Sequence, residues 1–534
     1  MKKQSKSILE RLDNFFNSKS TLILFVSLGF SILFSFLLFN FRVSEAGDDS
    51  AYIFRAYDFV KESIFPTYQG SLYPLVLSLF VWIFGLNITI LKAVSLVAIL
   101  VHLYFFQKAF KGNVSGTLLA FAMLLISFNA YLLYYSSQTF SEAFFMMLQA
   151  LFIFFFSKQV INKTDIKIKD YALIAFMVFL LGITKTIGLF SLFVVITYFI
   201  FHKNWKGLGI TVLSFIVFYF AFSLIKTYAF DIRSSQFSSQ LELLLQVDPY
   251  NKSKGMETFS GFIDRFTTNS QLYLSKHLYK FVGLKANPKT TSVFLTLLTY
   301  VLFLGSIVVV FKKNKHLFFV GLYLLFLCGA SFLSLQVKWD QDRIVIIYLP
   351  LILIYIFSGF YYLSFNKKLK SLQVILPILL LVIFFTNLKV TTKKVKANDK
   401  YLTETLAGNR FYGMTPDWIN YIKMSEWAAK NITKDVKIAC RKPSISFIYT
   451  ERKFYGIYRF STQDADALLK RLKDANVRYV IMASLRKYPN QKTQYTINTV
   501  QRYLYYIQAK YPHKIRLIHS IGRDEKAHLI EIVH

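Results

Sequence analysis

The sequence predicts a polytopic α-helical membrane protein that carries a soluble α/β domain at its C-terminal end. Of its 534 residues, 54% are hydrophobic and the mean hydropathy is +0.42, so the chain is more apolar than an average soluble domain. Long apolar runs alternate with short basic segments as far as about residue 390. The remaining residues, 391–534, mix polar and apolar positions in the patterns of short strands and helices.

The net charge of +34 indicates membrane topology rather than nucleic-acid binding. In a soluble protein such an excess of Lys and Arg would indicate a nucleic-acid partner. Here many of the basic residues lie in short clusters between apolar runs, a pattern typical of the cytoplasmic loops of membrane proteins. We therefore expect membrane lipids, and no nucleic acid, among the partners.

Eleven apolar runs, some of them interrupted, are long enough for membrane-spanning helices of roughly 20 residues. They lie near residues 21–41, 89–107, 115–133, 142–157, 171–184, 187–201, 207–226, 291–311, 317–335, 344–363 and 371–390. The apolar stretch 71–85 is too short to span comfortably. We interpret it as an interfacial or re-entrant helix on the outer side of the membrane.

The placement of Lys and Arg predicts that the basic N-terminus, residues 1–20, lies in the cytoplasm. In this orientation the cytoplasmic segments carry nineteen Lys and Arg and the short outer segments carry six, as the positive-inside rule requires. An odd number of spans then places the C-terminal domain outside. We expect a multi-pass protein of the cytoplasmic (inner) membrane with an extracytoplasmic C-terminal domain.

The predicted transmembrane domain, residues 21–390, carries a first outer loop at 42–88 and a large outer loop at 227–290. The C-terminal domain follows at 391–534. Its patterns predict helices from Pro416 to about Lys430, at 464–476 and at 495–510, and strands at 436–440, 477–482, 514–521 and 527–533. Alternating strands and helices favour a small α/β domain.

Acidic residues are scarce, with 29 in the whole chain, yet five of them fall in the first outer loop. On a helix that begins near Asp48, Tyr52 and Arg55 follow at four and seven residues and share a face with it. Asp48 and Asp49 could serve as a general base or as metal ligands. The alternative is a solvated acidic loop in which Asp48 caps the helix.

Glu142 is a further candidate because it begins a strongly apolar run. An ionisable residue in that position is expected to face the interior of the helix bundle or a polar cavity. The alternative is a carboxylate that only complements the dipole at the start of a helix.

Basic residues at the outer ends of predicted spans form the third group: Lys92, Lys185, Lys338 and Arg343. Inside the protein, their side chains would suit an anionic lipid headgroup, since Arg binds phosphate through two parallel hydrogen bonds and Lys as a point charge. The alternative is that these long side chains snorkel to the membrane surface, and we favour it for Lys92.

Four segments occur in an order, spacing and predicted sidedness that match a known set of motifs. They are Gly47–Tyr52 continuing to Arg55, Tyr73–Gly85, Tyr134–Glu142 and Arg343–Pro350. Together they resemble the GT-C superfamily of polyprenyl-phosphate-sugar glycosyltransferases, in the bacterial branch related to protein O-mannosyltransferases and the lipid A aminoarabinose transferase. The sequence departs from that pattern at Asp49, at Leu75, and at Lys185, where the family usually has Glu, Pro and Arg.

The resemblance implies an inverting enzyme that transfers one sugar from a polyprenyl-phosphate donor to an acceptor at the outer face. The acceptor is a lipid, a glycan or a protein. The implied roles are Asp48 as base, Asp49 in acceptor orientation or metal binding, and Glu142 as a supporting acid or ligand. Lys185, Lys338 and Arg343 would bind the donor phosphate, and Tyr52, Arg55 and Tyr73 the substrates. A divalent cation stays open as a cofactor, because some relatives need one and others do not.

Two other functions are compatible with a membrane protein of this kind. A flippase or transporter of lipid-linked glycans, without transferase activity, would place charged residues near the middle of the bilayer between discontinuous helices. Lys185, between two short apolar runs, is the feature that supports it. An O-antigen-ligase-like or oligosaccharide transferase would share the donor chemistry but transfer a whole glycan.

The predicted topology can be tested with fusions to the C-terminus. Because the charge distribution places His534 outside, a C-terminal alkaline phosphatase should be active, and a fluorescent protein that matures only in the cytoplasm should stay dark. The opposite pattern would show that a span has been miscounted, and the segment 71–85 would be the first to re-examine.

Overall fold

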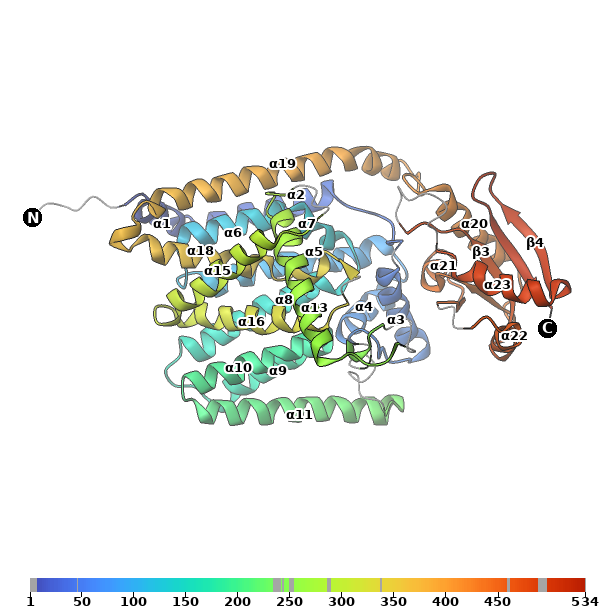
Figure 1. Ribbon diagram of the computed structural model, residues 1–534, viewed down its shortest axis with the longest axis horizontal. Coiled ribbons are helices and arrows are strands. Elements are labelled where there is room, and N and C mark those ends of the chain that lie inside the picture. Colours follow the sequence, from blue (N-terminus) through green and yellow to red (C-terminus); the bar gives the residue numbers. More distant parts are fainter. Residues whose placement is uncertain are drawn as a thin grey trace, which may run out of the picture. The chain divides into compact units, whose positions relative to one another are not determined.

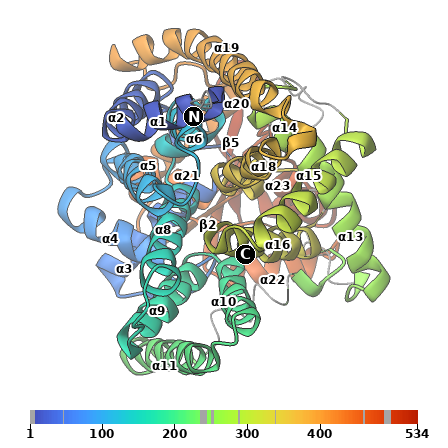
Figure 2. The ribbon, with the colours of Figure 1, turned by 90° about the vertical axis from the view of Figure 1, so that its left-hand side faces the viewer.

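The protein is described by a computed structural model that covers residues 7–45, 47–233, 242, 244–248, 254–285, 290–336, 339–458, 462–487 and 497–533. These residues fall into two compact units. The first comprises Met1–Phe39, Phe59–Phe80 and Thr89–Asp399, and the second comprises Asn40–Asp58, Val81–Ile88 and Lys400–His534. Figures 1 and 2 show the ribbon from two directions.

The first unit is a bundle of helices, which Figure 2 shows nearly end-on. Each of the eleven predicted runs forms a helix or a pair of short helices. Their bounds are α2 Ser20–Leu37, α5 Ile88–Phe110, α6 Gly116–Phe128 with α7 Ala130–Leu133, α8 Ser141–Phe156, α9 Ile168–Thr184, η3 Thr186–Leu189 with α10 Phe190–Phe201, α11 Trp205–Phe230, α15 Val293–Phe311, α16 Lys315–Ser334, α17 Arg343–Ile346 with α18 Leu349–Ser364, and α19 Leu372–Leu406.

Within the described residues, seven helices are long and apolar enough to cross a membrane, or eight if α6 and its bent continuation through residue 137 count as one span. The bend between those two parts is 47°. The helix that the run 371–390 predicts continues to Leu406, well beyond its apolar part. The N-terminal segment contains a further helix, α1 Ile8–Ser18, which Ser7 and Glu10 cap reciprocally.

The first span shows how this bundle is held together. The buried side chains of α2 include Ser27, Ser31 and Ser35, whereas large apolar residues such as Phe25 and Phe36 are exposed. Ser31 donates a hydrogen bond to the Ser127 carbonyl of α6. Small polar residues between helices and apolar residues outside are expected where the surroundings are lipid, because apolar contact with neighbouring helices gains little there.

Two outer segments contain helices of their own. The stretch 71–85 forms α4 Leu72–Phe84, a helix of 13 residues, in agreement with its predicted short length. The loop 227–290 contains α13 Phe259–Gln271, a π-helical turn η5 Leu272–His277 and α14 Leu278–Phe281. The first outer loop contains α3 Asp48–Glu62.

The second unit contains a sheet that has five strands in its described part, in the order β2-β1-β3-β5-β4. The strands are β1 Lys437–Cys440, β2 Tyr455–Gly456, β3 Val477–Ala483, β4 Ile515–Ile521 and β5 Ala527–Ile532. β1 pairs in parallel with β2 and β3, whereas β5 pairs antiparallel with β3 and β4. The predicted C-terminal α/β domain is confirmed; α21 and β2 are additions that the sequence pattern does not predict.

Helices cover both faces of this sheet. They are α20 Pro416–Asn431, α21 Pro443–Thr450, α22 Ala465–Asp474 and α23 Thr499–Lys510. Successive strand residues alternate between the faces, so Val480 and Ile530 pack with the leucines of α22 and the apolar side of α23. Cys440 points to the other face, where its sulfur contacts Ser446 of α21.

Candidate active site

A buried carboxylate in the helical unit pairs with two cations. Glu142 lies in the first turn of α8 and is fully buried. Its Oε1 atom accepts hydrogen bonds from Lys185 Nζ at 2.7 Å and from Arg343 Nε at 2.6 Å. The side chains of both cations are about four-fifths buried, at 19% exposure each. One carboxylate oxygen is thus shared by two cations from separate segments of the chain.

Both cations stand at places where a helix is interrupted. Lys185 separates α9 from the short 3-10 helix η3 and has an extended backbone, with φ −143° and ψ 132°. Arg343 begins the four-residue helix α17. Its guanidinium lies over the ring of Phe140, 5.0 Å from the centroid, which provides an apolar and polarisable support.

Gln149 provides a second link between α8 and the segment of Arg343. It follows Glu142 by seven residues and therefore lies on the same face of α8. Its side-chain amide donates a hydrogen bond of 3.1 Å to the carbonyl of Ile347, four residues after Arg343. The sequence signal for this contact is an amide at helical spacing from Glu142 in an apolar run.

Tyr73 is linked through Ser95 to the segment that precedes Glu142. It is fully buried, and its hydroxyl is 3.0 Å from Ser95 Oγ of α5. Ser95 Oγ in turn donates to the carbonyl of Gln138 at 2.6 Å. This chain of hydrogen bonds fixes the extended residues before α8, and it gives Tyr73, expected to bind substrate, a positioning contact.

The segment before Arg343 is held by the π-helical turn of the large outer loop. The two ring nitrogens of His277 lie 2.6 Å from Asp342 Oδ1 and 2.7 Å from Asp340 Oδ1. Lys280 and Lys276 contact the same two carboxylates at 2.5 Å each. Burial alone would raise the pKa of Asp342, but its contacts with His277 and Lys280 outweigh burial and lower the pKa to about 2.

The first outer loop places its acidic pair at the start of a helix, as predicted. Gly47, with φ +87°, accepts the first hydrogen bond of α3 from Ala51 and so takes the capping position, which leaves Asp48 as the first helical residue. Asp49 is fully buried, and its carboxylate accepts hydrogen bonds from the backbone and side chain of Ser44 at 2.6 and 2.9 Å.

Other residues of the second unit lie beside this pair. Arg55 lies over the ring of Tyr52, which confirms that these two residues share a face of α3. Burial raises the pKa of Glu45, while Arg42 and Lys442 oppose that change. Burial lowers the pKa of Lys442 to about 8, in spite of the nearby carboxylates of Asp48, Asp49 and Glu45.

The structure thus brings together Glu142, Lys185 and Arg343 in one unit and Asp48, Asp49, Tyr52 and Arg55 in the other. Lys338 lies outside the described residues. Lys92 is fully buried, near the ring of Phe39, so the snorkelling orientation favoured for it is wrong.

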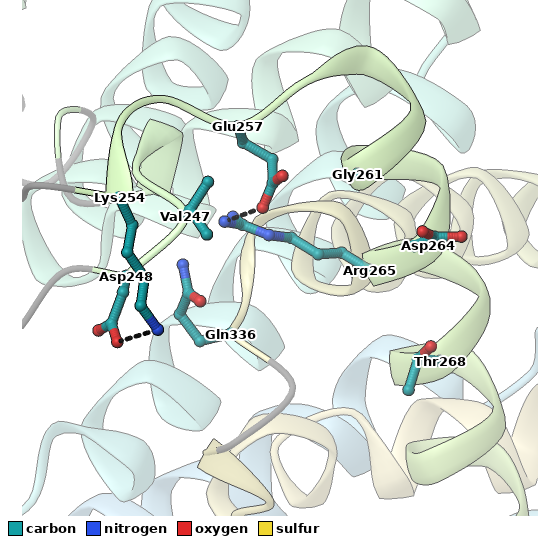
Figure 3. A pocket seen from close by; sticks show the side chains of 9 residues that line it. All are labelled: Val247, Asp248, Lys254, Glu257, Gly261, Asp264, Arg265, Thr268 and Gln336. Atoms are coloured by element: carbon teal, nitrogen blue, oxygen red, sulfur yellow. Dashed lines mark ion pairs between the residues drawn. The ribbon is translucent and has the colours of Figure 1, made fainter. Parts of the chain in front are cut away.

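A polar pocket of about 380 Å³ lies in the large outer loop, beside α13 (Figure 3). Arg265 forms an ion pair with Glu257 and donates hydrogen bonds to two backbone carbonyls, and Lys254 pairs with Asp248. Because both cations that line the pocket are paired with carboxylates that also line it, the pocket lacks the surplus positive charge that a phosphate group requires.

The described part of the chain contains no group of three or more His, Cys, Asp or Glu side chains arranged to hold a metal ion. Asp49, one of the two expected metal ligands, directs both carboxylate oxygens to Ser44. We assign no step of the reaction to a divalent cation.

The architecture is similar to that of membrane glycosyltransferases of known structure. ArnT from Cupriavidus metallidurans with bound undecaprenyl phosphate has a TM-score of 0.52 at 12% identity, covering 96% of this chain and 98% of ArnT. Apo ArnT has a TM-score of 0.50 at 11% identity with the same coverage. The apo oligosaccharyltransferase of Archaeoglobus fulgidus also has 0.50 at 11%, covering 86% of this chain and 69% of its own.

No protein-family model and no curated protein sequence matches the chain. At the identities of the structural matches, the likeness establishes the fold. The GT-C fold predicted from the four sequence motifs is thereby confirmed, and with it the polytopic helical architecture.

The buried ion cluster leads to a prediction about stability. Glu142→Gln keeps the shape of the side chain but leaves two largely buried cations without their carboxylate, so it should lower stability by about 3 kcal/mol. Thermal unfolding in detergent measures this. The matched control is Glu426→Gln, because Glu426 pairs with Arg410 at the surface, where the cost should be below about 1 kcal/mol.

A double-mutant cycle strengthens the test. Adding Lys185→Met to Glu142→Gln removes one of the two cations that have lost this carboxylate, so the double variant should be more stable than the sum of the two single effects. Additive effects, or equal losses from Glu142→Gln and Glu426→Gln, would show that the cluster is not coupled.

Proposed function

We propose that this protein is an inverting glycosyltransferase that moves a sugar from a polyprenyl-phosphate donor to an acceptor at the outer membrane face. The observation that carries the proposal is the cation pair of Lys185 and Arg343, held by the buried Glu142 within a GT-C fold. The crystal structure of ArnT with undecaprenyl phosphate supports a lipid phosphate as the class of donor.

The charge balance of the reaction suits this cluster. A sugar linked through a phosphodiester to a polyprenyl chain carries one negative charge at neutral pH. When the bond between the sugar and phosphate oxygen breaks, its electron pair stays on the phosphate, and the leaving polyprenyl phosphate gains negative charge. Lys185 and Arg343 would stabilise this charge as it develops.

The remaining step is removal of a proton from the acceptor. In a single displacement the acceptor oxygen attacks the anomeric carbon from the side opposite the phosphate, which inverts the configuration, and its proton passes to a base. We assign that role to Asp48, the first residue of α3. Asp49 holds the start of the helix through Ser44. In this assignment Glu142 orients the two cations and does not take the proton.

The proposal extends to the setting of the reaction. The donor tail would lie in the cytoplasmic membrane, and the acceptor, a lipid, glycan or protein, would be used at its outer face. Purified protein in detergent, supplied with undecaprenyl-phosphate sugars and with membranes from a deletion strain as the acceptor source, tests the reaction. Detergent removes the two compartments that a transporter needs, so release of undecaprenyl phosphate together with a glycosylated product would exclude a purely transporting role.

The first prediction from this function concerns the base. Asp48→Asn keeps the size of the side chain but removes the proton acceptor, so turnover should fall on the order of 100-fold or more. Expression and melting temperature should stay unchanged. The control is Asp474→Asn, an exposed carboxylate of α22, which should retain wild-type turnover. Wild-type turnover in Asp48→Asn would remove Asp48 from this role.

The second concerns the donor phosphate. Arg343→Lys loses the planar guanidinium that can bind phosphate through two parallel hydrogen bonds, so it should weaken donor affinity more than acceptor affinity. Arg343→Ala should weaken it further. Apparent donor affinity at fixed acceptor concentration is the measurement, with the exposed Arg523→Lys as control. An unchanged donor affinity in Arg343→Ala would leave Arg343 a structural role only.

A further inference from the structure

The C-terminal domain, which carries no sequence motif, contacts the segment that holds the acidic pair. Both belong to the second compact unit. Ser50, next to Asp49 on α3, has its hydroxyl 3.0 Å from that of Ser444 at the start of α21. Further along α3, the rings of Phe54 and Tyr57 meet Phe447 of α21 edge to face, at centroid distances of 4.8 and 4.9 Å.

The end of this contact is an ion pair. Asp58 on α3 lies 2.7 Å from the ammonium of Lys453, which follows α21. A hydroxyl pair, two aromatic contacts and an ion pair thus follow one another at helical spacings, so α3 contacts α21 and the residues after it over about two turns. The C-terminal domain therefore fixes the orientation of the helix that begins with Asp48.

Lys442 places a positive charge at the beginning of that helix. A Cβ atom on Gly47, the capping residue of α3, would lie 3.6 Å from Lys442 Nζ and 3.7 Å from its Cδ. The Lys442 side chain therefore passes directly beside the residue that precedes Asp48. Its ammonium interacts electrostatically with Glu45, Asp48 and Asp49.

The backbone of Lys442 is itself held in place. The hydroxyl of Tyr421, a buried residue of α20, accepts a hydrogen bond from the Lys442 amide at 3.2 Å and lies 3.1 Å from its carbonyl oxygen, to which it donates. The same hydroxyl is 2.7 Å from Ser446 Oγ of α21. The backbone of Lys442 is thereby fixed between α20 and α21.

We propose that Lys442 is a positioning residue for the acidic pair, and that the C-terminal domain supplies it to the active site as the counter-ion that orients the Asp48 carboxylate. This inference rests on the function proposed above. Three carboxylates within five residues repel one another, and one cation among them offsets that repulsion and favours a single arrangement. In this proposal the C-terminal domain contributes directly to catalysis, because it supplies Lys442.

Burying the Lys442 ammonium beside these carboxylates lowers its pKa and therefore costs folding stability. Its lowered pKa, about 8, means that the charged ammonium is less favourable in the folded protein than in the unfolded chain. The resulting loss of folding stability is present in full below pH 8. It disappears as the pH rises toward 10.5, the ordinary pKa of a lysine. Lys442→Met should therefore have a melting temperature at neutral pH at least equal to that of the wild type.

The charged groups around Lys442 define how activity should depend on pH. The first outer segment contributes Glu45, Asp48, Asp49 and Arg42, the neighbouring residue is Arg441, and α20 contributes Asp417. As Lys442 loses its proton near pH 8, the orienting charge is lost and kcat should decrease. In Lys442→Arg the charge persists, so that decrease should move to higher pH or vanish.

The kinetic test compares three variants of the full-length protein. Lys442→Met should lower kcat by on the order of 10-fold to 100-fold, as expected when a catalytic group is misplaced, with the donor KM unchanged. Lys442→Arg should restore most of kcat at pH 7. Lys470→Met, at an exposed lysine of α22, is the matched control and should behave as wild type. Wild-type kcat and an unaltered pH profile in Lys442→Met would overturn the proposal.

A second measurement does not depend on activity. The rate of acetylation of Lys442 by acetic anhydride, followed by mass spectrometry across pH, gives the midpoint of its deprotonation. In Asp48→Asn that midpoint should move to lower pH, because one favourable carboxylate is lost, whereas Lys470 should not change. An unmoved midpoint would refute the coupling. If no polyprenyl-phosphate sugar supports transfer, the proposed function fails, and this measurement still decides whether Lys442 and Asp48 interact.

Discussion

The carboxylate of Glu142 is the constraint on which the helical unit depends. A fully buried carboxylate is tolerated only when its charge is paired and its oxygens accept hydrogen bonds, and here one oxygen accepts from both Lys185 and Arg343. For both cations to reach this oxygen, α9 ends before Lys185 and α17 begins at Arg343. The interruptions of these helices, which otherwise resemble imperfect spans, follow from the need to bring two cations to one atom.

Further hydrogen bonds around the Glu142 carboxylate hold the neighbouring segments, and with them the two cations, in place. Gln149 ties α8 to the turn after Arg343, the chain from Tyr73 through Ser95 holds the residues before Glu142, and His277 contacts both carboxylates that precede Arg343. Charged groups that are held in fixed positions do not need to reorganise when charge develops beside them. The rigidity of the cluster is thus as informative as its charge.

The sequence predicted the fold well because lipid exposure and strand periodicity leave strong local patterns. All eleven apolar runs form helices, and four of the five described strands of the C-terminal domain lie where the alternation of residues predicts them. The pairing of Glu142 with Arg343 could not be predicted, because it joins residues 201 positions apart and depends on three helices meeting. The hydrogen bonds between Asp49 and Ser44 could not be predicted either, because no sequence motif marks Ser44 as a partner. The contact of Lys442 with the first outer loop depends on a turn before α21, a helix that the sequence pattern does not predict.

The buried ion cluster also has a consequence for how the chain is made. Lys185 follows Glu142 by 43 residues and Arg343 follows it by 201. At a synthesis rate of about 5–20 residues per second, Lys185 is made roughly 2–9 seconds after Glu142, and Arg343 roughly 10–40 seconds after it. The first helices can therefore enter the membrane before the later helices arrive. Until Arg343 is made, Glu142 can pair only with Lys185.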